Sequence, residues 1–328
     1  MNKSNEEFAS KLLAGNRVAL GQAITLAESK TEADMLFAHE LLTRVIGHTG
    51  KSVRIGITGV PGVGKSTFID AFGTYLTTLG KKVAVLAVDP SSTKTKGSIL
   101  GDKTRMKNLS RNPNAFIRPT ATGTVLGGVA DRTRETVLLC EAAGFDIIII
   151  ETVGVGQSET TVRTMVDFFL LLMLAGAGDE LQGIKKGIIE MADALVITKA
   201  DGENEVAANQ AWANYQHALH LLAPASSGWQ ARVITASAVQ HTGIAETWQL
   251  IESFLQAVHL TGYFTRNRKI QNQTWFYESI QAQLFQHLHQ SEKMKTHLER
   301  YEQEIANDLC LPSAAAHQLV KDFLKALI

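Results

Sequence analysis

The chain has 328 residues, of which 45% are hydrophobic and 20% charged, proportions typical of a soluble globular protein with one large domain and extensions, or with two domains. Its 32 Lys and Arg residues balance its 32 Asp and Glu residues, so no nucleic-acid or membrane partner is expected. Cys140 and Cys310 lie far apart, which excludes a disulfide framework or a CxxC metal pair and favours a reduced, cytoplasmic setting.

Residues 4–50 have a helical pattern. In the first predicted helix, apolar side chains recur at spacings of three and four, at Phe8, Leu12, Leu13, Leu20 and Ile24. Thr31 and Asp34 resemble a capping box and predict a second helix through Leu36 to Val45. The opening MNKSNEEFASKLL lacks the apolar stretch of a signal peptide and is too acidic for a typical transit peptide, so no targeting segment is expected there.

Beyond residue 50, short apolar runs alternate with helix-length segments. The predicted strands are Val53–Thr58, Lys82–Val88, Phe145–Ile150, Phe168–Leu174, Ala194–Thr198 and Arg232–Thr235. This alternation predicts an α/β fold with a mostly parallel sheet between helices, and ligands bind such sheets at the carboxyl ends of the strands. The most apolar run, residues 168–177, is too short for a bilayer span, which takes about 20 residues.

Strand signals stop near residue 262, and the tail is predicted to be helical. Lys295 with Glu299, and Arg300 with Glu304, are opposite charges one helical turn apart. We interpret the tail as a dimerisation arm, with helices packed on their own domain as the alternative. The expected organisation is a helical N-terminal extension, a P-loop GTPase domain and a helical C-terminal arm, over residues 1–50, 51–261 and 262–328.

The first predicted strand runs into GVPGVGKST, which fits the phosphate-binding pattern G-x-x-x-x-G-K-S/T in full. Glycines let backbone N–H groups turn toward phosphate oxygens, and the following helix directs its positive end at the anion. Lys65 is expected to reach the β- and γ-phosphates, and the Ser66 hydroxyl to bind Mg²⁺. The predicted nucleotide-binding residues here are Gly59, Pro61, Gly62, Val63, Gly64, Lys65, Ser66 and Thr67.

Three carboxylates near strand ends are candidates for the metal site. Asp89 ends VAVLAVD, Asp102 lies in SILGDKTRM, and Glu151 ends FDIIIIE. A carboxylate at the mouth of a parallel strand can hold Mg²⁺ directly or through water, although each could also be a solvated acid. Glu151 stands where switch GTPases carry the aspartate of D-x-x-G, and Gly154 keeps the glycine whose N–H contacts the γ-phosphate.

The stretch LVITKAD, residues 195–201, resembles the base-reading N-K-x-D pattern of GTPases. The Asp201 carboxylate can accept from guanine N1–H and the 2-amino group, which adenine does not offer, and the Lys199 stem can stack along the ring. Thr198 replaces the usual Asn, which helps to tie this loop to the P-loop and approaches guanine N7; threonine has only one hydroxyl for these tasks. In VITASA, Ser237 and Ala238 resemble the loop whose backbone N–H meets guanine O6.

Several segments occur together in order: GVPGVGKSTFID, VDPSS, GSILGDKTRM, IIIIETVGVGQSE, AGAGDELQGIKKGIIEMAD and KADG. With the N-terminal helical segment and RNRKIQNQTWFYESI in the tail, they resemble the methylmalonyl-CoA mutase-associated GTPases of the MeaB/ArgK type. The resemblance covers nearly the whole chain, and DELQGIKKG is peculiar to this group.

The resemblance implies a P-loop GTPase of the SIMIBI class, which also contains the signal-recognition and MinD-like GTPases. Members are homodimers through helical C-terminal arms and hydrolyse GTP in a Mg²⁺-dependent reaction, slowly alone and faster with a partner. They bind an adenosylcobalamin-dependent acyl-CoA mutase, usually methylmalonyl-CoA mutase. They act as chaperones that gate loading of the cobalamin cofactor and protect the mutase from inactivation.

Site roles follow from the same resemblance. Lys65 and Ser66 are the P-loop pair, and Asp89, Asp102 and Glu151 surround Mg²⁺ and the attacking water. Gln157 belongs to the second switch, and Asp179 and Lys185 belong to a third switch that communicates with the mutase. Lys185 could stabilise charge on the phosphates, as an arginine finger does. Thr198 departs from the family pattern, and so does RPTATGTVLGG at residues 118–128.

Three alternatives stay open from the sequence. A nucleotide-dependent kinase acting in amino-acid transport would need an arginine-rich lid, which is not evident, and Asp201 disfavours ATP. A metal-insertion GTPase usually carries His-rich or clustered Cys motifs. Here the closest groups are the pairs His217 with His220 and His287 with His289. The third alternative is a module that binds GTP and gates without hydrolysing it.

Overall fold

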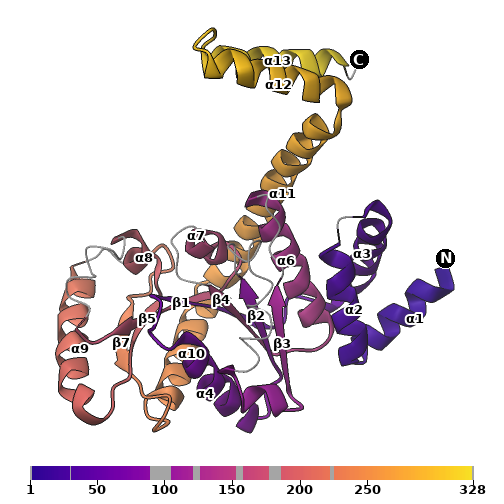
Figure 1. The fold of residues 1–328 in the computed structure, drawn as a ribbon. Coiled ribbons are helices and arrows are strands. Elements are labelled where there is room, and N and C mark those ends of the chain that lie inside the picture. The colour runs from indigo at the N-terminus through magenta and orange to yellow at the C-terminus, as the bar shows by residue number, and fades with distance from the viewer. Residues whose placement is uncertain are drawn as a thin grey trace. The chain divides into compact units, whose positions relative to one another are not determined.

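A computed structural model describes residues 2–29, 31–88, 105–120, 126–152, 158–176, 186–221 and 225–326. The chain divides into two compact units, Met1–Asn272 and Gln273–Ile328. The first unit is built on a 7-stranded sheet in the order β3-β2-β4-β1-β5-β6-β7 (Figure 1), and every strand pair in it is parallel. The predicted α/β fold with a parallel sheet between helices is therefore confirmed.

Six strands correspond to the six predicted runs. They are β1 (Val53–Gly59), β2 (Val83–Val88), β4 (Ile147–Thr152), β5 (Phe168–Leu174), β6 (Ala194–Thr198) and β7 (Arg232–Thr235). The prediction was wrong in omitting a seventh strand, β3 (Ala115–Thr120). β3 contains Pro119, and among the described strands it pairs with β2 alone, at one end of the strand order. Proline is tolerated on such an edge strand because one side of its backbone forms no sheet hydrogen bonds.

Helices cover both faces of the sheet (Figure 1). One apolar cluster joins the strands to α4 (Lys65–Thr78) and α10 (Ile244–Leu260), with Phe68, Phe72 and Phe254 fully buried. The other cluster joins the opposite strand faces to α6, α7, α8 and α9, whose bounds are Leu126–Ala142, Ser158–Arg163, Lys186–Met191 and Glu205–His220. The strand residues are buried on both faces, as in a sheet covered on two sides.

The N-terminal region forms three helices that pack into the second cluster: α1 (Asn2–Leu13), α2 (Arg17–Ala27) and α3 (Glu32–Val45). The prediction of one helix running through Ile24 was wrong. The chain turns at Gly15, which has φ +75°, and Asn16 then caps α2 by accepting from Val18 N and Ala19 N. The predicted Thr31 cap is confirmed, since its side chain accepts from Asp34 N.

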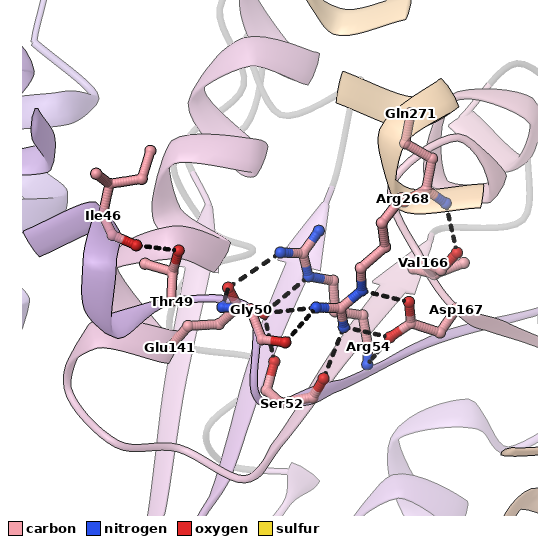
Figure 2. A network of polar contacts seen from close by, with 10 residues as sticks. All are labelled: Ile46, Thr49, Gly50, Ser52, Arg54, Glu141, Val166, Asp167, Arg268 and Gln271. Carbon is pink, nitrogen blue, oxygen red and sulfur yellow. Dashed lines mark hydrogen bonds and ion pairs between the residues drawn. The ribbon is translucent and has the colours of Figure 1, made fainter. Parts of the chain in front are cut away.

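A polar network closes the amino-terminal edge of the sheet (Figure 2). Glu141, at the end of α6, accepts from Arg54 Nε at 2.9 Å and from the Ser52 hydroxyl at 2.6 Å. The Gly50 N–H also donates to this carboxylate, at 2.8 Å. Burial alone would raise the pKa of Glu141, but hydrogen bonds and charge from Arg54, with help from Ser52 and Gly50, leave the pKa below its usual value.

The same network holds the first turns of α11 (Tyr263–Gln290). Arg268 donates to both oxygens of Asp167, from Nε at 2.8 Å and from its terminal nitrogen at 2.7 Å, and Asp167 in turn accepts from Arg54 N at 2.8 Å. Gln271 donates to Val166 O at 2.7 Å (Figure 2). These contacts place the start of α11 in the α/β unit, which ends at Asn272.

The second unit is helical, as expected for the tail. It contains the end of α11, α12 (Glu292–Ala306) and α13 (Pro312–Ala326), which enclose a small core of Leu288, Met294, Leu319 and Phe323. The expected pair Arg300–Glu304 is present at 3.6 Å. Throughout the described ranges, no helix is both long enough and apolar enough to cross a membrane.

Candidate functional site

The sheet topology places the candidate site at the carboxyl end of β1. β1 lies between β4 and β5, and the strands reached next along the chain, β2 and β3, lie beyond β4 while β6 and β7 lie beyond β5. The connections therefore reverse direction at β1, and such a reversal opens a crevice where parallel sheets bind ligands. The predicted phosphate loop follows β1 at this position (Figure 1).

Backbone geometry explains the glycines of this loop. A Cβ on Gly59 would lie 2.6 Å from the Leu172 carbonyl oxygen on β5, so no side chain fits there. Gly62 has φ +81° and Gly64 has φ +92°, in the left-handed region that favours glycine. α4 begins directly afterwards at Lys65, so its amino-terminal N–H groups open onto the loop.

Lys65 bridges the loop from the first turn of α4. Its Nζ donates to the carbonyl oxygens of Gly59 at 2.7 Å and Val60 at 3.3 Å. Burial lowers the pKa of Lys65, while the charges of Glu151 and Glu159 oppose that shift. The lysine therefore places a partly desolvated positive charge against the glycine loop, where a phosphate would be attracted.

Two predicted metal ligands lie together. The Ser66 hydroxyl donates to Glu151 Oε1 at 3.2 Å, joining α4 to the end of β4, and Glu151 is buried. A hydroxyl and a carboxylate are hard oxygen ligands that fit Mg²⁺. The other two candidates, Asp89 and Asp102, lie outside the described residues.

Sequence reasoning missed a second buried carboxylate beside the loop. Glu159, in α7, is 1% exposed, and its Oε1 accepts from the Thr58 hydroxyl at 3.4 Å. Thr58 also accepts from the hydroxyl of Thr152 at 2.7 Å. The signal was present in GVGQSE, where Glu159 follows Gln157 by two positions, but a glutamate in a polar stretch usually indicates a solvated helix start.

Thr198 joins the end of β6 to the phosphate loop. It is 5% exposed, and its hydroxyl lies 2.7 Å from Val63 O and 3.1 Å from Met173 O. Thr198 therefore ties the end of β6 to the phosphate loop, the task for which the usual pattern has Asn. Lys199 follows with φ +56°, and a Cβ on Gly64 would lie 3.9 Å from Lys199 Cε, so this side chain reaches the phosphate loop.

The two halves of the predicted base site meet. The buried Ser237 hydroxyl donates to Asp201 Oδ2 and accepts from Gln240 N at 3.1 Å. Beside them, Ala200 N donates to Ala236 O at 3.1 Å. The fold therefore sets the loop that ends with Ala238 against the loop that ends with Asp201.

Other predicted residues lie outside the described ranges: Gly154, Gln157, Asp179 and Lys185.

His220 belongs to one of the histidine pairs weighed under the metal-insertion alternative. It lies within hydrogen-bonding distance of Gln230 at 3.0 Å and of Gln216 at 3.3 Å. Among the residues whose positions are described, no group of three or more His, Cys, Asp or Glu side chains could hold a metal ion.

Comparison with known proteins agrees with this geometry. Residues 20–293 match the family model of the methylmalonyl-CoA mutase-associated GTPase MeaB. A relative from Caulobacter vibrioides is 52% identical over 85% of both chains. The mitochondrial methylmalonic aciduria type A homolog of Mus musculus is 44% identical over 95% of this chain and 78% of its own.

A solved structure supports the same assignment. A protein described as a LAO/AO transport system kinase matches 99% of both chains with a TM-score of 0.79 and 38% identity. The P-loop fold and these relatives identify the protein as a nucleotide-binding GTPase. The chain belongs to the family of methylmalonyl-CoA mutase-associated GTPases of the MeaB type.

Proposed function

We propose that this GTPase is a chaperone that binds an adenosylcobalamin-dependent acyl-CoA mutase, with methylmalonyl-CoA mutase as the first candidate. It gates loading of the cobalamin cofactor and protects the mutase from inactivation. Membership of a family defined by association with methylmalonyl-CoA mutase carries the proposal. The name of the mouse relative, which refers to methylmalonic aciduria, supports it.

Phosphate binding is assigned to residues 59–67, with Lys65 against the β- and γ-phosphates and the N–H of Gly154 against the γ-phosphate. Ser66 and Glu151, which already lie 3.2 Å apart, would hold Mg²⁺ together with Asp89 and Asp102. The ion would neutralise charge on the phosphates. Asp89 and Glu151 are assigned to orient the attacking water.

The second and third switches are assigned to residues that lie in the stretches GVGQSE and AGAGDELQGIKKG. Gln157 belongs to the second switch, and Asp179 and Lys185 to the third, where communication with the mutase is expected. Lys185 would add positive charge to the phosphates during hydrolysis. These roles rest on the family pattern.

Guanine is assigned to the loops at the ends of β6 and β7. Asp201 would accept from guanine N1–H and the 2-amino group, and the Ser237 hydroxyl that donates to its Oδ2 fixes the orientation of the carboxylate. The backbone at Ser237 and Ala238 would meet O6. Lys199, held with its side chain over Gly64, would pack along the ring.

A homodimer through the second unit is supported by exposed apolar side chains on α11. Phe276, Tyr277 and Leu284 are 61%, 64% and 53% exposed. With Ile280 they follow helical spacings of three and four, which places them on one stripe. A contiguous apolar stripe usually marks an interaction site.

The proposed location is the cytoplasm. The free cysteines, Cys140 and Cys310, are consistent with a reduced cytoplasmic location.

The test measures phosphate release from GTP, with ATP in parallel, while purified methylmalonyl-CoA mutase is titrated in. We expect slow hydrolysis of GTP that accelerates with the mutase, and no acceleration with ATP. A mutase-independent rate with GTP would remove the partner assignment. Equal turnover of ATP, indifferent to the mutase, would favour the alternative of a kinase.

A further inference from the structure

The hydroxyl of Thr198 is already engaged by the protein backbone, which limits the hydrogen bonds that it can make to a bound base. The side chain ends β6 in the place where the N-K-x-D pattern has Asn, and it is almost fully buried. Its hydroxyl lies between two backbone carbonyl oxygens, 2.7 Å from Val63 O and 3.1 Å from Met173 O. Both neighbours can only accept hydrogen bonds.

A threonine hydroxyl has one proton to donate. That proton is shared between Val63 O and Met173 O, and the shorter distance favours Val63 O in the phosphate loop. Guanine N7 is also an acceptor, so a hydrogen bond to it would need a second donor. An asparagine amide has two N–H groups and could serve a carbonyl and N7 together, whereas threonine cannot.

We propose that this protein recognises guanine without a hydrogen bond from position 198 to N7, and that Thr198 acts as a tether for the phosphate loop. The inference rests on the proposed guanine site. Specificity would then come from the Asp201 carboxylate, which would contact N1–H and the 2-amino group, and from the Ser237–Ala238 backbone, which would contact O6. The ligand class extends to guanine nucleotides altered at N7, such as 7-deazaguanine nucleotides, in which a C–H replaces the nitrogen.

The experiment compares the dissociation constants of GDP, 7-deaza-GDP and ADP for the full chain by isothermal titration calorimetry. We expect 7-deaza-GDP to bind within about twofold of GDP, because no neutral hydrogen bond is lost. A loss of about fivefold or more with 7-deaza-GDP, alongside normal GDP selectivity over ADP, would overturn the inference. Equal binding of GDP and ADP would instead overturn the proposed guanine site on which it rests.

Three variants separate tethering from base reading. Thr198→Val keeps the shape and removes the hydroxyl, so GDP and 7-deaza-GDP should weaken by the same factor. Thr198→Ser keeps the hydroxyl and should retain most of the affinity for both. Thr198→Asn supplies a second donor and should create discrimination of about three- to tenfold against 7-deaza-GDP, the size of one neutral hydrogen bond.

The Thr198→Val variant gives a second, independent test of the inference. If it weakens GDP while leaving 7-deaza-GDP unchanged, the native hydroxyl reads N7 and the inference is wrong. A cooperative thermal transition, followed by circular dichroism, checks that each variant is folded before binding is measured. The parent comparison of GDP with 7-deaza-GDP needs no variant, so it decides the question even if a substitution disrupts folding.

Discussion

At the scale of single residues, Lys65 is the side chain most directly tied to turnover. Its Nζ already lies against the loop carbonyls of Gly59 and Val60, where a phosphate would accept from it. We expect Lys65→Ala to reduce GTP hydrolysis by about 100-fold or more, the usual cost of removing one donor to transition-state charge. The measurement is phosphate release under saturating GTP. Lys51→Ala, at an exposed residue before β1, is the matched control and should hydrolyse at the parent rate.

Asp201 makes a different prediction, about the base. Asp201→Asn replaces an acceptor by a side chain that can donate, so the guanine 2-amino group would lose its partner. We expect GDP to weaken by about 100-fold and xanthosine diphosphate, which has a carbonyl oxygen in place of the amino group, to bind more tightly than GDP. Competition binding with the three diphosphates GDP, XDP and ADP checks this. A variant that keeps the parent preference for GDP would contradict the role of Asp201.

The sequence predicts these residues because the patterns around Lys65 and Asp201 are local. Contacts across the fold are a different matter. Thr198 meets Val63 across 135 positions of sequence, and Glu159 meets Thr58 across 101. No periodicity or spacing encodes such separations. The arrangement of β1, β4 and β6 in one sheet brings these side chains together, so the structure is needed to identify Val63 and Met173 as the partners of Thr198 and to show that Glu159 is buried beside Thr58.

At the scale of elements, hydrophobic runs identified the strands that are buried in the sheet. β3 escaped because Pro119 and Arg118 break its apolar pattern, and an edge strand needs less burial than a central one. The N-terminal helix was predicted too long because the apolar spacing continues from α1 into α2 across the turn at Gly15. The spacing of apolar residues does not reveal a turn between two helices when the same spacing continues on both sides of it.

The network at the amino-terminal edge makes a prediction about pH. The pKa of Glu141 is held below its unfolded value, so the ionised group stabilises the folded state above that unfolded value, about 4.3. This stabilisation is lost as the pH falls through the lower, folded pKa. We expect the melting temperature to fall steeply below about pH 4.5, and less steeply in Glu141→Gln, which lacks the titrating group.

The same variant tests the network at neutral pH. Glu141→Gln leaves Arg54 and Arg268 with one carboxylate fewer in a buried setting, for which about 3 kcal/mol is a typical loss of unfolding free energy. Urea denaturation at pH 7 measures it. Glu7→Gln, on the exposed pair with Lys11, is the control and should unfold as the parent does. Equal stability of Glu141→Gln and parent would show that the charge of Glu141 contributes nothing net to the network.

At the scale of the whole molecule, α11 determines how the proposed dimer can be tested. Its first turns supply Arg268 and Gln271 to the α/β unit, and its later turns belong to the unit that begins at Gln273. Cutting the chain after Thr261 would remove both contacts and destabilise the GTPase unit. Loss of dimerisation could then not be separated from loss of folding, so point substitutions beyond residue 272 are the better probe.

We expect the double variant Phe276→Glu with Leu284→Glu to be monomeric. Both side chains are more than half exposed in the single chain, so in a dimer they would be buried by the partner and not by this chain's own core. Two carboxylates on that stripe would then lose their water on dimerisation, which is unfavourable. Size-exclusion chromatography with light scattering gives the mass, and GDP binding checks that the first unit is intact. Gln286→Glu, on the opposite side of the same helix, should stay dimeric. A double variant that remains dimeric would place the interface elsewhere, because two buried charges on a central stripe cost far more than such an interface tolerates.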